Sequence, residues 1–120
     1  MSHRSEMLAK RIEEGAAQLA SFAEGLSETE WAMPVSATDH RPIGVIVHHV
    51  ASVYPIEVEV ARTIAAGTPI TEVTWDAIAE MNSKHHREQT GVSRADALEL
   101  LRRNSRAAAD AVREFTDEQL

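Results

Sequence analysis

Apolar side chains recur every three or four positions through the first quarter of the chain. Such spacing places them on one face of an amphipathic helix, which we expect from about residue 4 to residue 26. Ser27 and Glu30 then have the spacing of a capping box, so a short helical turn follows and ends before Pro34. The apolar face of the first helix comprises Leu8, Ile12, Leu19, Phe22 and Leu26, with Ala16 and Ala23 on the same face.

The second apolar segment is predicted to be a helix over residues 43–66, with Pro42 in its first turn and Gly67 just beyond its end. Its residues 56–60 also alternate as a strand would. No other segment offers a strand partner, and a lone strand leaves its backbone unpaired. We therefore expect a helix that is kinked near Pro55.

Two further helices are predicted in the second half of the chain. Thr74 can cap a helix over residues 75–90 that has a thin apolar face, and Ser93 can cap another over residues 94–115. The closing segment 115–120 repeats the pattern of segment 26–31, with a capping hydroxyl after an apolar residue and Glu or Gln three positions on.

These elements predict an all-α, up-down fold of the four-helix-bundle type in a single domain, residues 1–120. Only three long apolar faces are present, so we expect the last bundle helix to be missing from this chain. The resulting open groove would be covered by a partner chain, most simply in a homodimer, or by a continuation past Leu120.

The amino-acid composition argues against several classes of function. The formal net charge of −7 without a long basic run argues against nucleic-acid binding. The absence of cysteine excludes thiolate metal sites and a cysteine nucleophile. Because no signal peptide or membrane span is evident in the pattern, we expect a cytoplasmic protein without membrane contact.

The pair His48-His49 lies within the most apolar run of the chain. Adjacent helical residues point about 100° apart, so one imidazole can face a buried site while the other lies near its rim. We take His49 as the inward residue and candidate metal ligand, and His48 as a rim residue of the pocket. The alternative for His49 is a half-buried histidine that bonds to a neighbouring backbone group.

Other polar residues could complete such a site. His85 follows Asn82 by three residues on one helical face, so His85 could supply a second metal-ligating nitrogen and Asn82 could line the pocket. Glu57 lies two turns beyond His49 and is a candidate ligand or base, or else a surface carboxylate. Tyr54 and Trp75 are the best candidates to line the pocket.

The order of these motifs resembles the DinB-like superfamily, which is also described as YfiT-like metal-dependent hydrolases. The resemblance rests on the segment 26–31 before Pro34, on the run 43–51 with His49 before Val-Ala, on the segment 82–85, and on the closing segment 115–120. It covers nearly the whole chain.

The resemblance implies a four-helix bundle, often dimeric, that binds a divalent metal ion such as zinc, nickel or iron. It implies a metal-dependent hydrolase or a transferase that uses a small-molecule, low-molecular-weight thiol. His49 matches the family's ligand from the second long helix. The family's ligand pair from the last helix has no counterpart here, so the metal site is expected to be incomplete. The alternative is a non-enzymatic helical module for dimerisation or other interactions.

Overall fold

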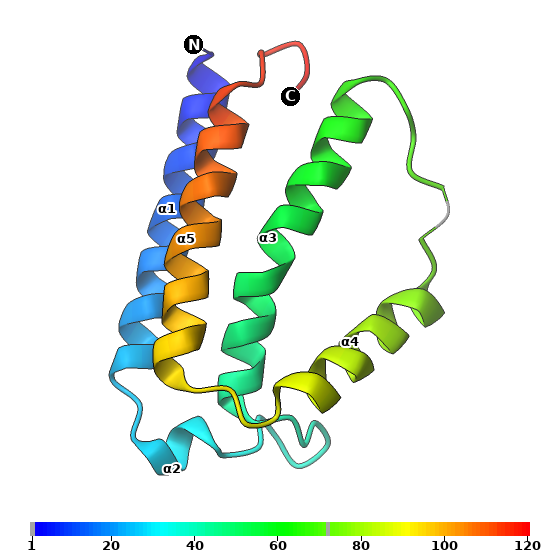
Figure 1. Cartoon of the computed structure of the whole chain (residues 1–120). Helices are drawn as coiled ribbons and strands as arrows, with labels where there is room; N and C mark the ends of the chain where they lie inside the picture. Colours follow the sequence, from blue (N-terminus) through cyan, green and yellow to red (C-terminus); the bar gives the residue numbers. More distant parts are fainter. Residues whose placement is uncertain (1, 72) are drawn as a thin grey trace.

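The protein is all-helical in its computed structural model, which describes residues 2–71 and 73–120 (Figure 1). Five helices follow one another and no strand forms among the described residues, apart from an isolated bridge between Pro34 and Pro42. The helices are α1 (His3–Glu24), α2 (Glu28–Trp31), α3 (Ile43–Ala65), α4 (Trp75–Gln89) and α5 (Arg94–Arg113). The all-α prediction is confirmed, including the helical reading of residues 56–60.

Capping side chains set most helix starts where the sequence predicts them. Ser27 and Glu30 form the reciprocal capping box, while Thr74 and Ser93 accept hydrogen bonds from the first turns of α4 and α5. Pro42 lies at the cap of α3 rather than inside its first turn. The repeated closing motif also folds locally, because Thr116 and Gln119 exchange hydrogen bonds.

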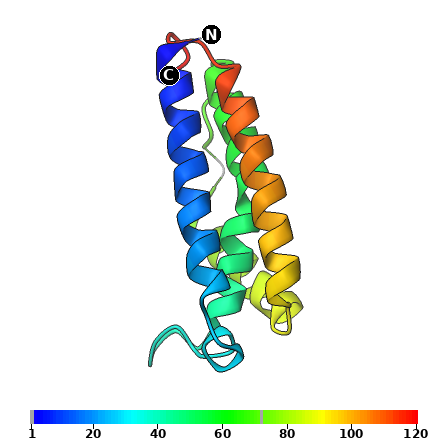
Figure 2. The ribbon, with the colours of Figure 1, turned by 90° about the vertical axis from the view of Figure 1, so that its left-hand side faces the viewer.

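Helix α5 is the central element of the fold. Both α1 and α3 pack along its length, whereas α1 and α3 contact each other only slightly (Figures 1 and 2). The hydrophobic core therefore lies in two contacts along α5, one with α1 and one with α3. One buried cluster joins Ala20 and Ala51 to Leu101, and a second joins Ala9 to Val112 at the other end.

Helix α4 does not take the fourth position of a bundle. It crosses away from the three long helices and approaches α3 only near its own C-terminal end (Figure 1). None of its residues is buried. The three long helices are therefore arranged with α1 and α3 on two sides of α5, and no described helix other than α5 packs against α1 and α3 together.

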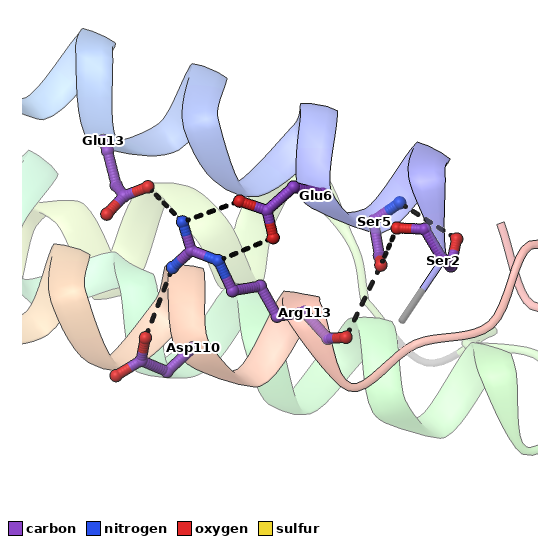
Figure 3. Close-up of polar contacts among 6 residues, drawn as sticks. All are labelled: Ser2, Ser5, Glu6, Glu13, Asp110 and Arg113. Atoms are coloured by element: carbon purple, nitrogen blue, oxygen red, sulfur yellow. Dashed lines mark hydrogen bonds and ion pairs between the residues drawn. The ribbon is translucent and has the colours of Figure 1, made fainter.

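Arg113 ties the ends of α1 and α5 together (Figure 3). Its guanidinium donates to Glu6 at 3.0 Å and to Glu13 at 2.5 Å, and it approaches Asp110 at 3.3 Å. These hydrogen bonds raise the pKa of Arg113 and lower the pKa of Glu6. The fully buried Ser5 adds a hydrogen bond to the Arg113 carbonyl, so the polar cluster closes one end of the α1–α5 contact.

Pro55 lies inside α3, and the helix continues through it. Proline has no N–H, so the carbonyl four residues earlier, that of Ala51, lacks its usual helical partner. Asn104 of α5 replaces that donor: its amide Nδ2 donates to the Ala51 oxygen at 2.9 Å. Because Ala51 is fully buried, water cannot substitute for this hydrogen bond.

We expect Asn104→Ala to lower the free energy of unfolding by about 1–3 kcal/mol, because it leaves a buried carbonyl without a donor. In a Pro55→Ala background the backbone N–H returns, and the same Asn104→Ala substitution should cost less than about 1 kcal/mol. Urea unfolding of the four proteins in this cycle measures the difference. An equal cost in both backgrounds would show that Asn104 acts through packing alone.

Candidate functional site

Three imidazoles meet where α3 and α4 approach each other. The Nδ1 atom of His48 lies 2.7 Å from Nε2 of His85, which is a hydrogen bond between the two rings. The same rings stack, with centroids 5.0 Å apart and an interplanar angle of 24°. The ring of His49 meets that of His85 edge-on at a centroid distance of 5.3 Å. These three residues are called the histidine cluster below.

The sequence predicted an inward His49 and a rim His48, but the structure brings both to His85. Successive helical residues diverge by about 100°, and His85 enters between them from the side of α4, so each ring reaches it. His48 makes the closer contact, and both residues of the pair are half-buried. The signal for this arrangement was the doublet itself, since two adjacent histidines can flank one incoming side chain.

All three histidines are held toward the neutral form. Burial is the largest cause of the lowered pKa of His48, His49 and His85. The positive charge of Arg41 lowers the pKa of His49 and His85 further, while carboxylates oppose these effects from three helices: Asp96 acts on His48, Glu57 on His49 and Glu88 on His85. Neutral imidazole is the form that can bind a metal or accept a proton.

Asn82 lies one turn before His85 on α4 and carries an unused acceptor. Its Oδ1 atom is buried and has no hydrogen-bond partner among the described residues. A buried acceptor without a partner costs free energy, so its persistence beside the cluster is consistent with a role toward a ligand. The prediction that Asn82 shares a face with His85 agrees with this position.

The other residues predicted to belong to the pocket differ from one another in burial. Tyr54 is half-buried against the core, and burial and the charge of Glu57 raise the pKa of its phenol. Glu57 is exposed and reaches His49 only through its charge. Trp75 is 85% exposed, so the expectation that it lines a pocket is wrong for this conformation. It begins α4, about ten residues from His85 and thus about 15 Å along the helix.

Imidazole nitrogens are good ligands for a transition metal ion, but the three rings of the histidine cluster are not arranged around one point. Among residues 2–71 and 73–120, no three His, Cys, Asp or Glu side chains surround a common point as ligands would. Two nitrogens bound to one tetrahedral zinc ion lie about 3.3 Å apart, whereas His48 and His85 share a proton at 2.7 Å. A metal ion would have to replace this hydrogen bond.

A separate hollow lies at the base of the fold and contains no member of the histidine cluster. It has a volume of about 640 Å³ and is lined by Trp31, Gly44 and Val92, among others. Trp31 covers Gly44 so closely that an added Cβ would lie 2.2 Å from the indole ring, and its Nε1 donates to the Val92 carbonyl at 3.0 Å. This contact fixes the start of α3 beside the turn that follows α4.

Comparison with known proteins identifies no relative. No family model matches the chain, and no curated protein or solved structure matches it significantly. The α3 helix is long and apolar enough, by length and composition, to cross a membrane, although the sequence pattern was taken to contain no such segment. One face of that helix packs on α5, and this feature alone does not decide where the protein resides.

We expect the histidine cluster to make folding stability depend on pH. A histidine with a lowered folded-state pKa binds a proton more readily when unfolded, so stability is present above the ordinary value of 6.5 and is lost as the pH falls below it. Replacing His48 and His85 together with Gln should flatten this decline. Urea unfolding at pH 7.5, 6.5 and 5.5 in a chelating buffer measures it.

The control for this experiment is His3→Gln, because His3 is exposed on α1 and lies outside the cluster. It should keep the wild-type decline. If the double variant also declines as steeply as wild type, the cluster histidines do not titrate as their burial requires.

Proposed function

We propose that the histidine cluster binds a divalent transition metal ion and that the protein is a DinB-like, metal-dependent hydrolase or thiol-dependent transferase. The observation that carries the proposal is the convergence of His48, His49 and His85 from two helices. Their lowered pKa values favour the neutral, metal-binding form at neutral pH. Zinc, nickel and iron all accept imidazole ligands.

His49 and His85 are the proposed primary ligands, with His48 as the partner that orients or joins them. A bound metal ion would polarise a substrate or lower the pKa of a bound water or thiol. The unpaired Oδ1 of Asn82 would accept a hydrogen bond from a water or substrate at the site. Glu57 supplies negative charge near His49, and Tyr54 packs against the hydrophobic core.

A second candidate function is a non-enzymatic helical interaction module. It is favoured by the large apolar residues that α1 and α3 leave half-exposed, among them Leu8, Phe22, Ile56 and Ile64. Contiguous exposed apolar surface marks interaction sites more often than chance positions. In this role the three histidines would serve only to dock α4 on α3.

Metal analysis separates the two functions. We expect purified protein, dialysed against Zn²⁺, Ni²⁺ or Fe²⁺, to retain about one equivalent of at least one of these ions. His49→Ala and His85→Ala should each weaken binding by more than about 100-fold, since even loss of an outer partner costs 10–100-fold. Elemental analysis and calorimetric titration measure the stoichiometry and the affinity.

His86→Ala is the matched control for these variants, because His86 is the next residue on α4 and its ring does not join the cluster contacts. It should bind metal as wild type does. If wild-type protein retains none of the three ions, the metal-dependent function is excluded and the interaction module stands. If all histidine variants retain the ion, the ligands lie elsewhere.

A further inference from the structure

The face of α4 that contacts α3 extends beyond the contact. Residues three and four positions apart share one side of a helix, and on this side α4 carries the half-buried Asn82, His85 and Gln89 near its C-terminal end. Ile78 and Trp75 continue the same side toward the N-terminus. Trp75 is nevertheless 85% exposed, and the first turn of α4 lies apart from α3 (Figure 1). The N-terminal half of α4 therefore presents an apolar surface that its contact with α3 does not use.

A corresponding face lies on α3. His85 lies between the directions of His48 and His49, and counting 100° per residue extends that intermediate direction along the helix. It passes through Ser52, Ile56, Glu59 and Thr63. Ile56 is 48% exposed. The contact at the histidine cluster thus continues on both helices into surfaces that remain exposed at Ile56 and Trp75.

The two faces match in register. Because α4 runs opposite to α3, equal rise per residue from the histidine cluster places Ile78 opposite Ile56 and Trp75 opposite Glu59 (Figure 1). Thr63 follows one turn later on the same side of α3. The methylene stem of Glu59 and the methyl group of Thr63 add apolar surface there. Trp75 can therefore pack on α3 if α4 rotates toward it while the histidine contact stays in place.

The segment between α3 and α4 is long enough for this movement. Residues 66–74 connect the two helices and can span up to about 30 Å. With α4 packed along α3, the segment would have to cover only about 9 Å along the helix axis and about 10 Å between the two axes. Gly67 has a φ of 90° and turns the chain directly after α3. The connection therefore permits α4 to lie either apart from α3 or along it.

We propose that α4 is a lid that pivots on the histidine cluster and closes against α3, so that Trp75 packs between Ile56 and Thr63. In the closed position the N-terminal half of α4 covers Asn82 and Ser52, which lie beside the cluster. A ligand enters while α4 is open, and closure excludes water from it. The apolar surface that Trp75 and Ile56 bury stabilises the closed position. Closure does not require a metal ion, because apolar contact between the two helices drives it.

The fluorescence of Trp75 tests closure on the full chain. Trp31, the other tryptophan, is only 7% exposed, so acrylamide quenches mainly the emission of Trp75. Ile56→Glu places a charge where Trp75 packs. We expect this variant to raise the quenching constant by about 2-fold or more and to shift emission to longer wavelength, because it moves the population toward the open position. Ile56→Leu should match wild type. Quencher titration in a chelating buffer measures the effect without any metal ion.

Ile64→Glu is the matched control, because Ile64 is also a partly exposed isoleucine of α3 but lies about 80° from Ile56 around the helix. It should leave the quenching constant at the wild-type value, and circular dichroism checks that every variant is folded. Equal quenching of wild type and Ile56→Glu overturns the proposal, because Trp75 then does not pack on Ile56. So does an Ile64→Glu variant that raises quenching as much as Ile56→Glu.

Discussion

The hydrogen bond from Asn104 to the carbonyl of Ala51 is the constraint on which the position of α3 depends. Without it, a helix carrying Pro55 would place an unpaired carbonyl in its contact with α5, at a residue that water does not reach. With it, α3 runs through the proline and still packs along α5. His48 and His49 lie on this helix, so the geometry of the histidine cluster depends on the same contact.

The alanines of α1 explain why so much apolar surface stays partly exposed. Ala9, Ala16, Ala20 and Ala23 form the buried face, and their small size lets α1 approach α5 closely. The bulkier residues lie on the adjacent flank, where neither α3 nor α4 covers them fully. Small side chains of α1 thus form the contact with α5, and several of its large apolar side chains stay partly exposed.

Sequence periodicity predicted the helices well but did not separate the buried from the exposed residues on the apolar face of α1. The predicted face combined large apolar residues with Ala16 and Ala23. The two alanines are buried, whereas Leu8 is 40% exposed and Phe22 54% exposed. Alanine gives an ambiguous signal, because it suits a helix whether it is buried or exposed. The distance between α1 and α5 determines which of these residues are buried. That distance depends on how the helices pack, which the pattern within one helix does not contain.

The sequence indicated candidate residues for the site, but it did not indicate how their side chains are arranged relative to one another. His49, His85 and Asn82 follow from helical position, because each stands out from its local pattern. The role of His48 depends on the side from which α4 approaches α3. The segment between α3 and α4 determines that side, and helical periodicity contains no information about it. The same limit applies to Trp75, whose aromatic character indicates a pocket but whose helix diverges from the others.

Helix α4 has no buried residue, so its hold on α3 depends largely on polar contacts such as the ring pair His48–His85. His85 is also a proposed primary ligand, so the docking of α4 and the binding of a metal ion are thermodynamically linked. A ligand that joins imidazoles from both helices adds its binding free energy to the docking of α4, and the order of α4 in turn raises the affinity of the site.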